Sequence, residues 1–262
     1  AMAALLARAT IFIGTLYLMR HRLDMVSFKK PDPGELRQSW RDILHVGIPD
    51  SGTNIIVPVG AAVVTAMIAR FGPDAVAGFG VASRIESMML VMYYALSAII
   101  GPFVGQNFSA GKEERILRAL WLCTAFCIGS GLVIAGLLAW MSGWLPGLFS
   151  DSESVRQVTA MFLWIVPLSY GTYGMVMVMN ASFNGLGYPI PGVVISVSRI
   201  VVLYIPVALI AMQFFDIAGI FAAYAIANIV SGLGAYVWAR STVRNRCAEE
   251  AVLRKAAAEA RP

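Results

Sequence analysis

The chain has 262 residues, of which 58% are hydrophobic and only 13% are charged, and its mean hydropathy is +0.72. A soluble domain usually carries about a quarter charged residues, so this composition excludes an ordinary soluble domain and indicates a membrane protein. The formal charge of +5 does not predict a nucleic-acid partner, because the basic residues lie mostly between apolar segments instead of on a soluble basic face.

The beginning of the chain, residues 1–20, is apolar apart from Arg8 and the final Arg20, and it resembles the end of a transmembrane helix cut in mid-span. Residues 21–42 are polar, with two lysines next to a Pro-Asp-Pro-Gly turn, and we expect a linker there. A polar tail occupies residues 241–262. Between linker and tail, residues 43–240 contain six apolar segments long enough to cross a membrane, at 43–70, 77–104, 116–141, 156–180, 190–212 and 217–239.

The basic residues are distributed unequally between the two sides of these segments. Fifteen of the 20 lysines and arginines lie in the linker, in the connection after residue 111, in the tail, or at the ends of the apolar segments that adjoin them, whereas the opposite side has only Arg70 and Arg156. Connecting segments rich in Lys and Arg stay in the cytoplasm. We therefore expect a multi-pass protein of the plasma membrane, or of the inner membrane in a Gram-negative bacterium, with linker and tail cytoplasmic.

A glycine-rich sequence, GPFVGQNFSAG at residues 101–111, ends the second apolar segment. Gly105 and Gly111 permit a tight turn where the helix leaves the lipid. The side chains of Gln106 and Asn107 can satisfy helix carbonyl groups that the turn exposes. The motif is therefore largely structural, and its value is as an identifier.

This sequence resembles the signature of the multidrug and toxic compound extrusion (MATE) family, with Ser109 where the family usually has glycine. Residues 77–87, AGFGVASRIES, are similar to the start of the same helix in that family. Shorter similar stretches lie at 148–150, 180–189 and 219–221, so the resemblance covers about residues 43–240. It implies an all-α integral membrane protein whose six transmembrane helices form one lobe of a two-lobe exporter, plus the truncated end of a preceding helix.

The resemblance also implies a function and partners. A MATE exporter moves cationic or amphipathic compounds out of the cell by alternating access, driven by a proton or sodium gradient, and works within the lipid membrane. The missing N-terminal lobe of the same protein would be a further partner. The sequence has no Ser-His-Asp order, no P-loop and no HExxH motif, so we expect neither an enzyme nor an organic cofactor nor a metal site.

Two other functions remain open from the sequence. The first is a flippase for a lipid-linked precursor, for which a lumen crowded with Arg and Lys would be expected. The second is a non-transporting membrane scaffold or truncated remnant, because only one lobe is present.

Glu86 is the main candidate for coupling to an ion. It lies about ten residues into its helix, or roughly 15 Å, near the middle of the membrane. A carboxyl group at that depth needs a partner or a water-filled cavity, and it can exchange a proton or bind sodium. The alternative is a structural ion pair with Arg84 or Arg199 that locks helices together. Because Arg84 is only two residues away and points to another helix face, Arg199 is the more suitable partner.

Asp50 is a second ion-coupling candidate, about one turn inside the cytoplasmic end of its span, where it can equally act as a cap or gate residue. Buried amides suit hydrogen bonds between helices or the lining of a cavity. Flexible methionines offer a soft surface for varied apolar compounds, although they also suit ordinary packing. The substrate-pathway candidates are Asn180, Asn54, Tyr93, Met89 and Asn228.

Overall fold

The computed structural model describes residues 2–22 and 32–259, and within them every regular element is a helix. The chain divides into two compact units, Ala1–Leu44 and His45–Pro262. The first unit contains α1 (Met2–His21) and the beginning of α2 (Pro33–Ile68). Because α2 begins at Pro33, helix occupies part of the expected linker at 21–42, and residues 23–31 of that linker lie outside the described residues.

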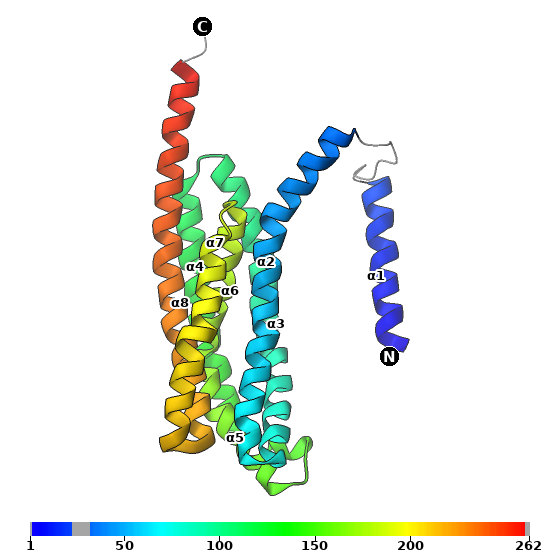
Figure 1. The fold of residues 1–262 in the computed structure, drawn as a ribbon, viewed down its shortest axis with the longest axis vertical. Coiled ribbons are helices and arrows are strands. Elements are labelled where there is room, and N and C mark those ends of the chain that lie inside the picture. Colours follow the sequence, from blue (N-terminus) through cyan, green and yellow to red (C-terminus); the bar gives the residue numbers. More distant parts are fainter. Residues whose placement is uncertain (1, 23–31, 260–262) are drawn as a thin grey trace. The chain divides into compact units, whose positions relative to one another are not determined.

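The second unit continues α2 and contains the remaining helices (Figure 1). Short 3-10 turns follow α2 and flank α5, and a π-helical segment, η4, joins α7 to α8. The bounds are η1 (Ala69–Phe71), α3 (Pro73–Ser109), α4 (Glu113–Met141), η2 (Leu145–Leu148), α5 (Glu153–Ile165), η3 (Val166–Ser169), α6 (Tyr170–Gly185), α7 (Ile190–Val197), η4 (Ser198–Tyr204) and α8 (Ile205–Glu259).

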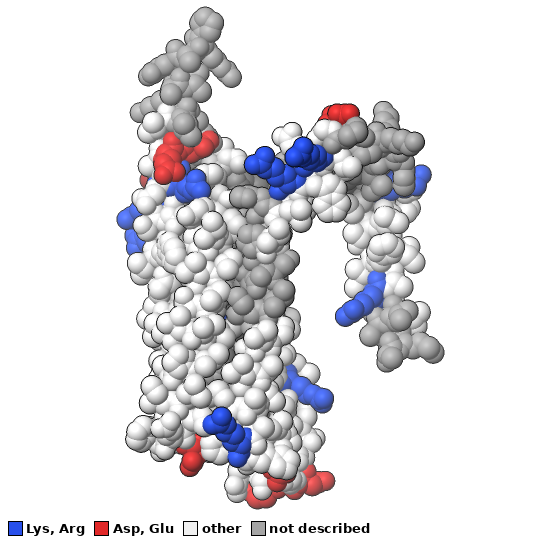
Figure 2. Space-filling view, in the orientation of Figure 1, with Lys and Arg blue, Asp and Glu red and all other residues white. Residues whose placement is uncertain are grey.

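Helices of the second unit have the length and apolarity of membrane spans. Charged side chains gather mainly at the two ends of this unit and leave most of the visible surface between them uncharged (Figure 2). This distribution suits a multi-pass membrane protein, because charge is costly within the hydrocarbon layer. Among the described residues, the segments that qualify as spans are Pro73–Ser109, Glu113–Met141, Glu153–Gly185 and Ile190–Val252.

Three of the expected spans need a closer description, and two of them, 190–212 and 217–239, lie in the single segment Ile190–Val252. Ile190–Val252 is not straight, because the backbone at Phe215 and Asp216 is non-helical and Asp216 has a positive φ of 48°. The chain reverses there and returns as an antiparallel arm (Figure 1). In the expected span 43–70, only the shorter apolar helix Pro58–Phe71 is found among the described residues.

Gly105 and Gly111 of the GPFVGQNFSAG motif have different roles. Gly111 has a φ of +69°, and the N–H groups of Gly111 and Lys112 donate to the carbonyls of Phe108 and Asn107. This is the Schellman end of a helix, in which glycine occupies the left-handed position. Gly105 instead lies inside α3, where a Cβ would come within 3.1 Å of the Gly185 carbonyl oxygen. The expected turn role is therefore correct for Gly111 and wrong for Gly105, which allows close contact with α6.

Helix α6 lies at the centre of the second unit and packs against α3, α4 and α8. Most of its side chains are buried. Its approach to α4 depends on glycine, because a Cβ on Gly171 would lie 2.7 Å from the Cys127 carbonyl oxygen. The ring of Tyr93, on α3, occupies the space beside Gly174. The face of α3 that carries Tyr93 is therefore packed against α6, and an adjacent face of α3 borders a cavity.

Candidate functional site

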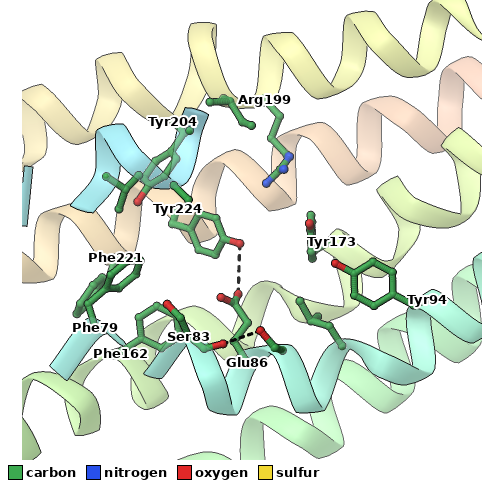
Figure 3. Close-up of a pocket in the computed structure, with 16 residues that line it drawn as sticks. Phe79, Ser83, Glu86, Tyr94, Phe162, Tyr173, Arg199, Tyr204, Phe221 and Tyr224 are labelled. Atoms are coloured by element: carbon green, nitrogen blue, oxygen red, sulfur yellow. Dashed lines mark hydrogen bonds between the residues drawn. The ribbon is translucent and has the colours of Figure 1, made fainter. Parts of the chain in front are cut away.

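A cavity of about 300 Å³ lies within the second unit (Figure 3). Side chains from α2, α3, α5, α6, η4 and α8 line it, so it is formed by segments far apart in the chain. We call it the aromatic cavity, because seven aromatic side chains border it: Phe79, Tyr94, Phe162, Tyr173, Tyr204, Phe221 and Tyr224.

Helix α3 contributes one face to the aromatic cavity. Ser83, Glu86, Ser87, Leu90 and Tyr94 all line it, and their spacing of three or four residues places them along one side of a helix. In Figure 3 the Glu86 carboxylate points towards Tyr224, whose hydroxyl donates a hydrogen bond of 3.2 Å to the Glu86 Oε1 atom. The ion-coupling candidate therefore faces a cavity in the membrane domain.

Arg199 reaches the aromatic cavity from the π-helical segment η4. The i→i+5 bonding of a π-helix brings residues five positions apart towards the same side, which lets Arg199 and Tyr204 both line the cavity. Arg199 is only 5% exposed, and its Nη1 atom donates to the Asn228 Oδ1 atom at 2.9 Å. Asn228 in turn donates to the Ser169 hydroxyl at 3.1 Å. The guanidinium also lies 4.7 Å from the centre of the Tyr173 ring.

The expected ion pair of Glu86 is not formed in the described structure. Ion pairs within 4.0 Å among the described residues join Arg156 to Asp151 and Arg246 to Glu249, and neither includes Glu86. Arg84 is exposed and does not line the cavity. Arg199 borders the same cavity as Glu86 but connects helices through the Asn228 amide. Glu86 and Arg199 therefore form no direct ion pair: Glu86 is hydrogen-bonded to Tyr224, and Arg199 is hydrogen-bonded to Asn228.

Two of the amide candidates, Asn180 and Asn228, do not line the cavity. Asn228 is fully buried, and its Oδ1 atom accepts the hydrogen bond from Arg199. Asn180 donates to the Ser196 hydroxyl at 3.0 Å and so joins α6 to α7. Neither is among the residues that line the aromatic cavity.

Tyr93 and Met89 also lie outside the lining. Tyr93 is buried, and its hydroxyl contacts the Ser130 hydroxyl at 3.2 Å. Met89 is half-buried and packs against the apolar core. The adjacent Tyr94 lines the cavity instead. The side chains of Asp50 and Asn54 lie outside those that the structure describes.

Sequence reasoning missed most of the aromatic lining. Lining positions on α3 had a detectable signal, because Ser83, Ser87 and Tyr94 share a helical face with Glu86. Tyr173, Tyr204 and Tyr224 had none, since they come from three other segments and meet only after folding.

The sequence of this chain is similar to those of known transporters. A family model described as MatE matches residues 49–210. The FAD transporter of Shewanella oneidensis is 31% identical over 228 residues, which are 87% of this chain and 50% of that protein. The probable multidrug resistance protein YoeA of Bacillus subtilis is 23% identical over 93% of this chain and 55% of its own length. The chain thus spans about half the length of the curated relatives it matches.

Solved structures share the fold. The Vibrio cholerae MATE transporter VcmN in its bent form has a TM-score of 0.77 and 27% identity, over 80% of this chain and 48% of that one. An outward-facing multidrug resistance transporter of the MATE family has a TM-score of 0.84 over 94% of this chain and 56% of its own, at 18% identity. The second likeness concerns the fold alone.

Proposed function

The chain belongs to the MatE family of membrane transporters, and from that premise we propose that it forms one lobe of a two-lobe exporter driven by a cation gradient. The cargo would be cationic or amphipathic compounds, and the driving ion H⁺ or Na⁺, with no other cofactor. The observation that carries this proposal is the aromatic cavity, where an acidic group within the membrane domain borders a space suited to a small molecule.

The proposed lobe has six membrane passes. They are α2, α3, α4, the combined α5 and α6, and the two antiparallel arms on either side of Asp216. Residues 43–240 would form the lobe, with 1–20 as the end of a preceding helix, 21–42 as a cytoplasmic linker and 241–262 as a cytoplasmic tail. The bias of Lys and Arg towards one side supports this orientation in the plasma or inner membrane.

Glu86 would carry the coupling ion. Its carboxylate has one hydrogen-bond donor, Tyr224, and its other partners would come from the cavity. Binding of H⁺ or Na⁺ at Glu86 and binding of cargo would favour different conformations of the two lobes. Each ligand shifts that balance only by its difference in affinity for the two states. Rocking of one lobe against the other then gives alternating access.

The proposed partners are membrane lipid, the cargo molecule and the N-terminal lobe of the same protein; no nucleic acid is expected. The chain spans about half the length of its relatives, so the second lobe would supply the rest of the pathway. A lipid-linked precursor flippase is less well supported, because Arg199 is the single basic residue among the described side chains that line the cavity. A non-transporting scaffold does not explain why Glu86 faces that cavity.

The test is efflux of a fluorescent cationic dye from cells that produce the protein at its native length. Glu86→Gln keeps the shape of the side chain and removes its charge, so we expect efflux to fall at least tenfold at matched expression and unchanged heat resistance. Glu114→Gln, at the exposed start of α4, is the control and should export normally. Undiminished efflux by Glu86→Gln would reject Glu86 as the coupling group. Loss of stable protein would assign it a structural role.

A further inference from the structure

Arg199 is a buried cation that the proposed coupling mechanism does not use. It is 5% exposed in the middle of a membrane segment, and one of its amino groups is held by Asn228. The guanidinium lies over the Tyr173 ring, 4.7 Å from its centre. These two contacts fix the direction of the side chain, which enters the space between Tyr224 and Tyr173 in Figure 3.

The charge of Arg199 has no neutralising partner within ion-pair distance. The ion pairs found within 4.0 Å in residues 2–22 and 32–259 do not include it. Glu86 borders the same cavity and its charge acts on Arg199, but the two side chains are not in ion-pair contact, and the Glu86 carboxylate accepts a hydrogen bond from Tyr224. The Nε–H group of Arg199 is buried and has no hydrogen-bond partner. A buried charge without a contact ion pair and an unused donor are both costly in a membrane interior, so this position favours an anionic ligand.

The surroundings of Arg199 specify the rest of the ligand. A guanidinium binds carboxylate and phosphate groups through a planar fork of N–H donors. Tyr94, Tyr173, Tyr204 and Tyr224 supply flat aromatic surfaces in the same cavity, and a volume of about 300 Å³ suits a small ring system.

We propose that Arg199 binds the carboxylate or phosphate group of a planar aromatic molecule whose ring lies among the tyrosines of the aromatic cavity. This inference rests on the proposed function, because it takes the aromatic cavity as the pathway of the cargo. It narrows the substrate class: amphipathic cargo includes aromatic anions, while Glu86, on the other side of the Tyr224 hydroxyl, remains available for the coupling ion.

Three naphthalene probes test the proposal because they share the ring and one attached carbon and differ in the polar group on that carbon and in its charge. They are 2-naphthoate, 2-naphthalenemethanol and 2-naphthylmethylammonium, and their fluorescence reports binding to the purified full-length protein in phosphatidylcholine nanodiscs. We expect the protein to bind naphthoate about tenfold more tightly than the neutral alcohol, or ~1.4 kcal/mol. Equal affinity for these two probes would overturn the anion subsite.

Substitutions then test whether the preference for naphthoate over the alcohol depends on Arg199. Arg199→Gln retains an amide donor for Asn228 but removes the charge, and should bind naphthoate and the alcohol equally. Arg199→Lys keeps the charge without the planar fork, and should retain about a threefold preference. Arg70→Gln, at an exposed position outside the cavity, is the control and should retain the full preference. A full preference in Arg199→Gln would reject the assignment. If that variant does not fold, the Lys variant and the wild-type protein still decide the question.

Two further experiments are needed. The first distinguishes a lipid headgroup from a soluble aromatic anion as the ligand of Arg199, and the second tests the proposed export function separately from the anion subsite. Repeating the binding in phosphatidylglycerol nanodiscs tests a lipid headgroup: if the preference disappears there, a lipid occupies Arg199 and the soluble aromatic anion is rejected. Efflux of the cationic dye from proteoliposomes tests the proposed function separately. Dye transport without a naphthoate preference rejects only the anion subsite. A naphthoate preference without transport rejects only the exporter and leaves Arg199 as a binding site for an anionic ligand.

Discussion

Tyr93 and Tyr94 are consecutive on α3 but belong to two different regions of the molecule. Tyr93 is 0% exposed and lies in a packed seam that we define by Tyr93, Cys127, Gly131, Gly171 and Gly174. Tyr94 is 53% exposed and lines the aromatic cavity. A rotation of about 100° between successive helical positions separates the two environments.

The difference shows that one face of α3 is packed between helices while the adjacent face borders a cavity. In the packed seam, three glycines let the α3, α4 and α6 backbones approach, and the Tyr93 hydroxyl contacts a carbonyl and a hydroxyl of α4. In the aromatic cavity, the side chains of Glu86 and Arg199 face open space. Substitutions in the packed seam should therefore change mainly the free energy of unfolding, and those in the cavity mainly the binding of ligands.

The largest expected effect comes from truncating the two tyrosines. Tyr93→Ala leaves a void in the packed seam and should lower the free energy of unfolding by about 3–5 kcal/mol. Tyr94→Ala should lower it by less than about 1 kcal/mol, because the side chain is half exposed, and should instead weaken binding of an aromatic ligand. Thermal unfolding in detergent and ligand titration of both purified variants measure this. Equal destabilisation by the two changes would remove the distinction between the regions.

The next effect concerns two glycines of α4. A Cβ on Gly131 would collide with the backbone of Gly171, so Gly131→Ala should cost about 1–3 kcal/mol of unfolding free energy. Gly129, two residues earlier, has nothing within 4 Å of its Cβ position. Gly129→Ala is therefore the matched control and should be neutral or slightly stabilising. If Gly131→Ala is tolerated equally well, close helix approach does not hold the packed seam together.

A smaller effect on stability is expected when the Tyr224 hydroxyl, which lies at the cavity, is removed. Tyr224→Phe keeps the ring but removes the donor to Glu86, so the free energy of unfolding should fall by no more than about 1.5 kcal/mol. The concentration of the coupling ion at half-maximal efflux should change about fivefold, which corresponds to ~1 kcal/mol. Efflux assays over a range of ion concentrations measure it. Tyr236→Phe, on the later part of α8 and outside the cavity lining, is the control. If the two variants reach half-maximal efflux at the same ion concentration, the Tyr224 hydroxyl has no part in coupling.

The smallest effect tests whether Asn180 belongs to the pathway. Ser196→Ala removes the acceptor for the Asn180 amide, and an interhelical hydrogen bond in a membrane protein contributes about 0.6 kcal/mol. We expect a loss of that size in unfolding free energy and unchanged efflux, because both residues lie outside the cavity lining. A strong loss of efflux at preserved stability would return Asn180 to the substrate pathway.

The helical class was predictable because each apolar segment is a local property of the sequence. Expected spans such as 116–141 agree closely with α4, which begins at Glu113 and ends at Met141. The motif at 101–111 predicted the end of α3, since a left-handed turn needs glycine at Gly111. Gly105 was misassigned because its role depends on Gly185 of α6, which is far away in the sequence.

The sequence by itself determined the membrane class, the positions of most helices and the presence of Glu86 as an acidic residue within an apolar segment. Only the tertiary structure decided what surrounds that residue. Tyr224 and Arg199 reach its cavity from segments more than a hundred residues away, and η4 departs from the 3.6-residue period on which helical faces are predicted. Apolarity and turn preference act between near neighbours, whereas the lining of a cavity depends on how helices approach one another.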